Sequence, residues 1–195
     1  NVLVDAAGAI AMPAGQRQTM TEAGCRVETF RPIRPFTLDR ANYRNHRRIL
    51  VVDGQTGITG GSGTSGKWSG NGRTEGHWRD TDVRVEGPVV AQLQGAFVEN
   101  WLEATGEILV GRDSFPPEQP LSRGAPAVVV AGTPSPARAS RARLLFQLLL
   151  ATASKSIEIT SPYFLPDRSA RRELAKMFPD NPIIARATRH EEALR

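Results

Sequence analysis

Residues 45–54 read Asn-His-Arg-Arg-Ile-Leu-Val-Val-Asp-Gly, a basic start followed by an apolar run and a turn signal. The run at 49–52 is continuous, which is typical of a strand buried on both faces. Asp-Gly marks a tight turn and residues 56–59 resume as a strand, so the sequence predicts a β-hairpin. Side chains two residues apart on a strand point the same way. His46 and Arg48 are therefore expected to face one pocket.

An imidazole beside a fixed cation suits chemistry on a phosphodiester. The cation neutralises the non-bridging oxygens while the imidazole attacks phosphorus. A solvated basic strand end is the alternative interpretation of the same residues. A glycine-rich loop, Gly-Gly-Ser-Gly-Thr-Ser-Gly, follows at residues 60–66. Its backbone N–H groups can approach an anion closely, although a flexible exit from the hairpin would have the same composition.

The segments around the hairpin alternate between strand and helix patterns. Strands are expected at 2–4, 26–30, 82–86, 128–130 and 157–160, and helices at 14–23, 88–102, 138–154 and 167–176. The helix that starts at Pro88 has the clearest pattern, because its apolar residues recur with a period of 3.6. The alternation predicts the α/β class, with a mixed β-sheet flanked by helices.

The composition is that of an ordinary globular protein: 195 residues, 39% hydrophobic and 23% charged. The net charge of +5 fits either a plain soluble surface or one that meets phospholipid head groups or nucleic acid. No apolar run approaches the roughly 20 residues of a membrane span. The single cysteine, Cys25, excludes an internal disulfide and a cysteine-based metal cluster.

The hairpin and its loop carry a signature. The chain resembles the phospholipase D superfamily, whose motif is His-x-Lys-x-x-x-x-Asp followed by a Gly-Ser-x-Asn-like turn. His46, Arg48 and Asp53 fall on the motif, and residues 60–63 fall on the turn. Further segments resemble the bacterial cardiolipin synthase branch: 43–46, 68, 76–81, 83–88 and 161–167. The resemblance covers residues 1–175 and implies a phospholipase D-like fold.

The resemblance implies a phosphatidyltransferase. His46 would form a phosphohistidine with a phosphatidyl group, Arg48 would stabilise the charge, and a second alcohol would resolve the intermediate. In a cardiolipin synthase both donor and acceptor are phosphatidylglycerol. Of the other two expected catalytic residues, Asp80 would orient the imidazole, with pairing to Arg79 or capping of a turn as the alternative, and Asp53 would hold the hairpin turn. No metal or other cofactor is implied.

The glycine loop supplies the residues expected to bind substrate: Gly61, Ser62, Thr64 and Ser65. The chain departs from the family pattern at three places. Arg48 stands in place of the signature Lys, and Gly63 in place of the signature Asn, whose hydrogen bond a nearby hydroxyl would replace. Asp82 stands where many relatives have His.

One motif is present where the superfamily uses two, one in each half. We predict a first half at 1–111 with one complete half-site, a linker at 112–126, and the beginning of a second half at 127–195 that is truncated or internally incomplete. The chain lacks an initiator Met and a basic lead-in, so it is interpreted as starting within a longer protein without a signal peptide. The isolated chain is expected to be inactive unless the missing second half, or a homodimer partner, supplies the second histidine.

The expected partners are a phospholipid, phosphatidylglycerol above all, and an anionic membrane surface. Trp68 and Trp78 would suit an interfacial surface, although core packing explains them equally well. Their presence favours lipid over nucleic acid. The expected location is the bacterial cytoplasmic membrane, peripheral or anchored by segments outside this chain. Two alternatives stay open: phospholipase D-type hydrolysis of a lipid or nucleic-acid phosphodiester, and an inactive anion-binding fragment.

Overall fold

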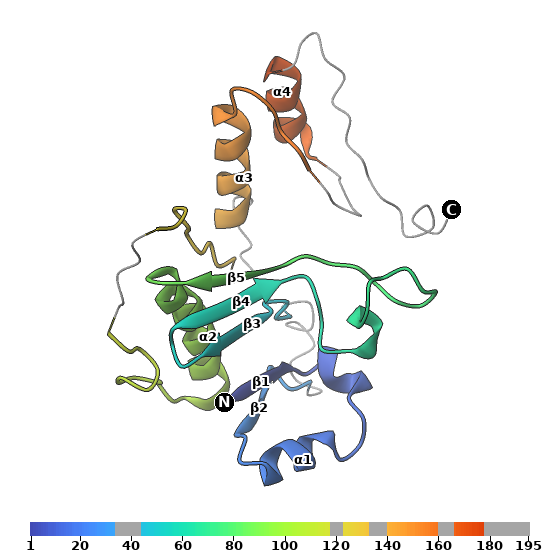
Figure 1. The fold of residues 1–195 in the computed structure, drawn as a ribbon, viewed down its shortest axis with the longest axis vertical. Coiled ribbons are helices and arrows are strands. Elements are labelled where there is room, and N and C mark those ends of the chain that lie inside the picture. The colour runs from blue at the N-terminus through green and yellow to red at the C-terminus, as the bar shows by residue number, and fades with distance from the viewer. Residues whose placement is uncertain (34–43, 118–122, 133–139, 160–165, 178–195) are drawn as a thin grey trace. The chain divides into compact units, whose positions relative to one another are not determined.

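A computed structural model describes residues 1–33, 44–117, 123–132, 140–159 and 166–177. The chain divides into two compact units, residues 1–63 with 80–129 and residues 64–79 with 130–195. Both contain elements drawn in Figure 1, and together they have the mixed α/β character that the sequence predicts. The predicted linker at 112–126 and the two flanking halves stay a prediction.

The first unit begins with a parallel strand pair. β1 (Val2–Asp5) and β2 (Val27–Phe30) run side by side, joined by η1 (Gly8–Ala11) and α1 (Gln16–Glu22). The predicted strands and helix are confirmed here. Gly24 follows α1 with φ of 87°, a left-handed conformation that glycine adopts at little cost and that ends the helix.

The second sheet is antiparallel and contains the hairpin. β3 (Ile49–Val52) pairs with β4 (Thr56–Gly60), and β4 pairs with β5 (Asp82–Glu86), in the order β3-β4-β5. The expected single mixed sheet is therefore wrong for the described residues. They form a two-stranded parallel sheet and a three-stranded antiparallel one, because no ladder of hydrogen bonds joins the two.

The hairpin turns where the sequence predicts. Asp53 and Gly54 have φ of 53° and 64°, and the N–H of Gln55 donates to the carbonyl of Val52 at 3.1 Å. Two successive left-handed residues are the geometry of a type I′ turn, whose twist matches that of the flanking strands. The Asp-Gly pair suits it because aspartate and glycine tolerate this conformation better than most residues.

The helix α2 (Val89–Thr105) covers one face of the first unit. It contacts strands of both sheets, β2 as well as β3, β4 and β5 (Figure 1). Its buried residues follow the helical period: Val90, Leu93, Ala96, Asn100 and Trp101. The Trp101 ring is fully buried and stacks on Phe97 with 5.7 Å between centroids. The buried face of this helix forms the core of the unit. The helix begins at Val89, one residue after the predicted start, and Pro88 is its N-cap.

β3 is covered on one face only, which corrects the prediction of a strand buried on both. Leu50 and Val52 are 54% and 46% exposed. The other face meets α2, since a Cβ atom at Gly57, the partner of Val51, would lie 2.6 Å from Leu93 Cδ1. Within the described residues no second layer covers the Leu50 face. The continuous apolar run at 49–52 therefore does not correspond to a strand buried on both faces.

The second unit contains a helical pair. α3 (Arg141–Thr152) and α4 (Arg168–Met177) pack through Leu150, Ala170 and Leu174, with Phe146 and Ile157 beside them. Both predicted helices are confirmed. Among the described residues neither 128–130 nor 157–159 forms a strand, so those two predictions are wrong; residue 160 lies outside the description. A β-branched run forms a strand only when it pairs with another strand, and among the described residues neither run does so.

None of the described helices combines the length and apolar character needed to cross a bilayer.

Candidate functional site

The residues that lead into β3 extend the alternation of that strand. His46, Arg48 and Leu50 are exposed, whereas Arg47 and Ile49 are partly covered. Thr59 Oγ1 on β4 donates to the carbonyl of Arg48 at 2.8 Å, which holds the main chain at that point. The exposure pattern agrees with His46 and Arg48 sharing the side of the hairpin away from α2.

Arg47, between the two predicted catalytic residues, is anchored on α2. Its Nη1 donates to the Ala96 carbonyl at 3.0 Å, to Glu99 Oε2 at 2.7 Å and to Asn100 Oδ1 at 3.3 Å. The variable position of the motif therefore fixes the segment to the helix. Sequence analysis missed this role, although the period of two already placed Arg47 opposite His46.

Asp5, at the end of β1, is a second residue that sequence analysis missed. Its Oδ1 accepts the N–H of Ala7 at 2.9 Å and of Gly8 at 3.2 Å, and its Oδ2 accepts the N–H of Asn45 at 2.9 Å. Arg44 Nη1 lies 4.0 Å from Oδ1. The carboxylate thus connects the end of β1 to the two residues before His46.

The glycine loop holds two carboxylates at close range. A Cβ atom at Gly61 would lie 2.1 Å from Asp80 Oδ2, so only glycine allows this approach. The N–H of Gly61 donates to the Thr81 carbonyl at 3.4 Å, and that of Ser62 to Asp82 Oδ1 at 3.2 Å. Two amides that the sequence assigned to an anion therefore have protein acceptors in this structure.

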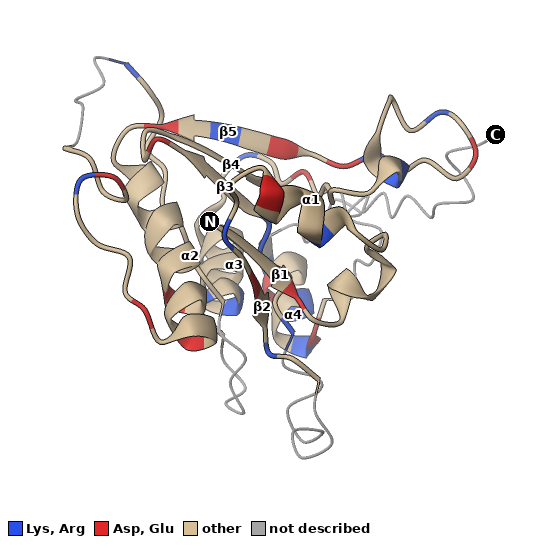
Figure 2. Cartoon of the chain, turned by 90° about the horizontal axis from the view of Figure 1, so that it is seen from below, with Lys and Arg blue, Asp and Glu red and all other residues tan. Residues whose placement is uncertain are grey.

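The strand beside the loop is acidic at both ends. Figure 2 shows the two acidic residues of β5 flanking a basic one, as its sequence Asp-Val-Arg-Val-Glu requires. Asp80 itself accepts the N–H of Thr81 at 2.7 Å through Oδ1. Among the described residues no group of His, Cys, Asp or Glu is arranged to hold a metal ion.

The other two predicted substrate-binding residues, Thr64 and Ser65, are exposed and belong to the second unit. They open the tryptophan loop, defined here as residues 64–79. Ser65 Oγ accepts the N–H of Lys67 at 3.4 Å and caps η3 (Gly66–Trp68). Its hydroxyl is thus engaged in local structure.

Two tryptophans pack inside the tryptophan loop. The Trp68 and Trp78 rings meet edge to face with 4.9 Å between centroids, and Lys67 Nζ lies 5.5 Å from the Trp78 ring. The N–H of Trp78 donates to the Lys67 carbonyl at 2.6 Å, which closes the loop. Trp78 is nonetheless 40% exposed, so an aromatic surface and a cation stand together at the surface of the loop.

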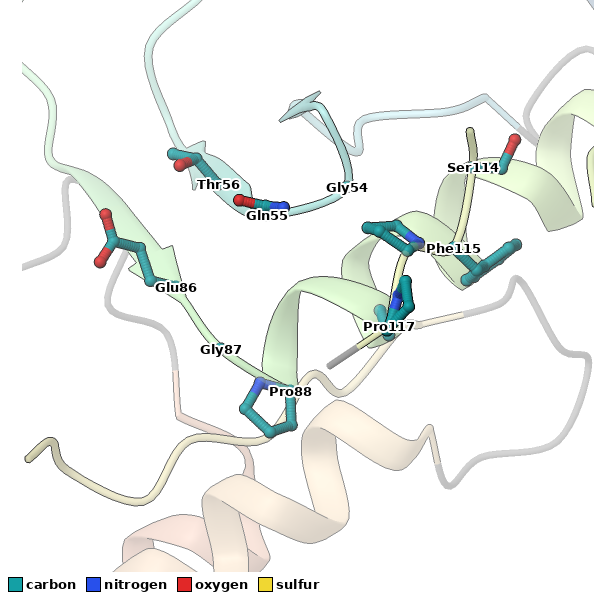
Figure 3. A pocket seen from close by; sticks show the side chains of 11 residues that line it. Gly54, Gln55, Thr56, Glu86, Gly87, Pro88, Ser114, Phe115 and Pro117 are labelled. Atoms are coloured by element: carbon teal, nitrogen blue, oxygen red, sulfur yellow. The ribbon is translucent and has the colours of Figure 1, made fainter. Parts of the chain in front are cut away.

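Asp53 lies at the opposite end of β3 from His46 and is exposed. A cavity of about 260 Å³ adjoins this end, between the hairpin turn, the end of β5 and a proline-rich segment (Figure 3). Its lining includes Gly54, Glu86, Pro88 and Pro116. The lining contains neither His46 nor Arg48, so this cavity is not the pocket expected in front of the two.

Comparison with curated proteins finds cardiolipin synthases. The chain is 33% identical over 166 residues to "Cardiolipin synthase" of Alkalihalophilus pseudofirmus, covering 85% of this chain and 33% of the relative. It is 36% identical over 171 residues to "Cardiolipin synthase A" of Pseudomonas putida strain W619, covering 86% and 34%. It is 32% identical over 202 residues to "Cardiolipin synthase" of Geobacillus kaustophilus, covering 96% and 40%.

The chain thus spans about a third of the length of the curated relatives it matches. No family model matches it, and no solved structure does. The family resemblance in the sequence is confirmed by the curated relatives, which match most of the chain. These similarities identify the chain as a cardiolipin synthase-like member of the phospholipase D superfamily.

Proposed function

We propose that the chain supplies one half-site of a phosphatidyltransferase that makes cardiolipin from phosphatidylglycerol. The similarity to curated cardiolipin synthases supports this choice of reaction. The observation that carries the proposal is the exposed placement of His46 and Arg48 on either side of an anchored Arg47. An imidazole and a cation on one exposed strand end, with their main chain held, suit a nucleophile that must meet a phosphate.

In the proposed mechanism His46 begins a double displacement. An imidazole nitrogen attacks the phosphorus of phosphatidylglycerol, and the new P–N bond forms as the P–O bond to glycerol breaks. The histidine of the second half protonates the departing glycerol oxygen. A hydroxyl of a second phosphatidylglycerol then attacks, loses its proton to that histidine, and breaks the P–N bond. Arg48 stabilises the charge on the non-bridging oxygens in both steps.

The glycine loop and two aspartates have supporting roles in this proposal. Asp80 orients the His46 imidazole through the ring nitrogen that does not attack, and its close packing on Gly61 limits where the carboxylate can go. The hydroxyls of Ser62, Thr64 and Ser65 serve the phosphate, with Ser65 leaving its cap on η3 to do so. Asp53 shapes the turn at the far end of β3.

A complete site needs a second signature histidine. The proposal places it in a second half of the same polypeptide, or in a homodimer partner. The proposed halves at 1–111 and 127–195 follow from the same reasoning. The chain alone, as printed, has negligible transferase activity on this account.

We further propose that the protein works at an anionic bacterial membrane, where its substrate resides. The tryptophan loop presents Trp78 together with Lys67, a pairing that suits the boundary between acyl chains and anionic head groups. Attachment is peripheral or through segments outside this chain.

The test is an assay of the full-length gene product that contains this chain, on vesicles of phosphatidylglycerol, with products separated by thin-layer chromatography. The proposal predicts cardiolipin and free glycerol in equal amounts. Phosphatidic acid without cardiolipin would instead assign hydrolysis. Lipid binding without any product would assign a non-catalytic anion-binding protein.

A further inference from the structure

We propose that Asp5 is a positioning residue for His46, acting through the main chain and never touching substrate. The proposal rests on the nucleophilic role of His46 given above. Asp5 and Arg44 face each other close to the start of the motif, with only 11% and 13% of their side chains exposed. A carboxylate with so little exposure needs hydrogen-bond donors from the protein. The donors that it has show which segments it connects.

The carboxylate of Asp5 divides its two oxygens between two segments. Oδ1 accepts the N–H groups of Ala7 and Gly8, which fixes the turn after β1. Oδ2 accepts the N–H of Asn45, which lies forty positions later. Hydrogen bonds to an ionised oxygen are about twice as strong as neutral ones. One side chain therefore joins the end of β1 to the residue that immediately precedes His46.

Neighbouring contacts complete a clamp around His46. Arg44 Nη1 donates to the carbonyl of Arg31 at 2.9 Å while lying 4.0 Å from Asp5. Asn45 Oδ1 accepts the N–H of Arg47 at 2.9 Å. Arg47 in turn holds α2 through its guanidinium. The main chain is thus fixed on both sides of His46, whereas the imidazole itself is exposed.

This arrangement matters for a covalent nucleophile. An error of about 1 Å in the position of a reacting group can cost on the order of 100-fold in rate. In Asp5→Asn one oxygen becomes an NH2 group, which cannot accept, so at least one of the three N–H donors loses its partner. The negative charge opposite Arg44 is lost as well. The nucleophile should then be misplaced while the substrate contacts of Arg48 remain.

The kinetic test uses the full-length gene product with Asp5→Asn, compared with Asp113→Asn as a matched control in an exposed loop. We expect kcat to fall about 10- to 100-fold with KM changed less than about threefold. The control should equal wild type in both. A rise in KM at constant kcat, or equal effects of the two variants, would overturn the positioning role.

A structural test on the 195-residue chain separates this proposal from the proposed function. In the wild-type chain, nuclear magnetic resonance should detect scalar coupling across the hydrogen bond from the Asn45 amide nitrogen to the Asp5 carboxylate carbon. In Asp5→Asn the backbone order parameter of His46 should drop, while that of α2 stays. Absence of the coupling, or an unchanged order parameter in a folded variant, contradicts the proposal even if cardiolipin synthesis is established. Because the coupling needs no variant, its absence would contradict the proposal even if Asp5→Asn does not fold.

Discussion

The two ends of β3 are held in opposite ways. Before the strand, polar groups fix the main chain: Asp5 accepts the N–H of Asn45, and Arg47 binds α2, so that His46 is left exposed. After the strand, packing against a proline ring holds the main chain. Gly54 lies so close to Pro116 that a Cβ atom on it would be 2.2 Å from the proline Cδ. The end before the strand exposes the proposed nucleophile, and the end after the strand forms the hairpin turn.

This difference between the two ends of β3 indicates different roles for the first and last residues of the motif, His46 and Asp53. His46 and Asp53 are seven residues apart and both exposed, yet only His46 stands in a polar clamp. Asp53 has a left-handed φ of 53° in a turn, a place that asparagine fills as well. The comparison therefore predicts that equivalent substitutions at the two ends will differ greatly in effect.

The largest effect is expected for His46→Asn in the full-length enzyme. Asparagine keeps hydrogen-bonding capacity but cannot form the phosphoenzyme, so turnover should fall by roughly 1,000-fold or more, with each tenfold worth about 1.4 kcal/mol of barrier. Asp53→Asn is the matched control and should retain most activity. Turnover rates and melting temperatures are measured for both variants. Similar losses of turnover in the two variants would contradict the difference between the two ends of β3.

Arg48→Ala should behave differently from His46→Asn. A cation that contacts phosphate in the ground state and the transition state affects both binding and rate, so we expect KM to rise and kcat to fall, together about 100-fold. Arg84→Ala, which removes an exposed arginine on β5, is the control and should change neither. A pure kcat effect would remove Arg48 from substrate binding.

Gly61→Ala is expected to cost about tenfold in kcat. Its Cβ atom would overlap the Asp80 carboxylate, with 2.1 Å to Oδ2, and would push that group away from its present place. Gly66→Ala is the matched control in the same loop, because its Cβ atom would meet nothing within 4 Å. If both variants keep wild-type kcat, Asp80 does not orient the imidazole.

At the far end, Gly54→Ala should reduce stability and leave kcat per folded molecule unchanged. The substitution combines strain at φ of 64° with overlap against Pro116, for a loss of about 1–3 kcal/mol in the free energy of unfolding. Gly24→Ala shares a positive φ of 87° but has open space around it, so it should lose less. Equal losses in urea unfolding would show that ring packing does not hold this end.

The smallest effect is expected in the second unit, at Asp167. Hydrogen bonding from the Ala170 N–H, with Arg143 nearby, lowers the pKa of this carboxyl below 3.8. A lowered folded-state pKa means that the charged form stabilises the fold, so the contribution is complete above pH 3.8 and is lost as the pH falls further.

The measurement is the melting temperature of wild type and Asp167→Asn as a function of pH. The gap between them should be constant near neutrality and should close below pH 3.8. Ser140→Ala removes the cap of α3, where Ser140 Oγ accepts the Arg143 N–H at 3.2 Å. Because the serine cap is neutral, the difference in melting temperature between wild type and Ser140→Ala should not depend on pH. A pH-dependent difference in this variant would contradict the assignment of the pH effect to Asp167.

Local signals in the sequence predicted the elements well. The Asp-Gly pair specified the hairpin turn, and the apolar period after Pro88 specified α2, because both depend on residues close together in the chain. The failures involve neighbours. Residues 128–130 and 49–52 look alike as apolar runs, but the first gains no strand partner among the described residues and the second is covered on one face.

The candidate site shows the same division. The spacing of His46 and Arg48 predicted a shared side of the strand, and their exposure agrees with it. Asp5 could not be found this way, since its bond to Asn45 joins residues forty positions apart without any local pattern. The glycine loop is predicted to let an anion approach closely, and in this structure the groups that approach Gly61 and Ser62 are carboxylates of the protein itself.

The most direct test of the central claim is the covalent intermediate on His46. Full-length protein is mixed with phosphatidylglycerol, quenched within the first turnover in alkaline denaturant, where phosphohistidine survives, and digested for mass spectrometry. The account predicts a phosphatidyl group on the peptide that contains His46, absent from His46→Asn. Cardiolipin formation without that adduct, or an adduct that persists in the variant, would contradict it.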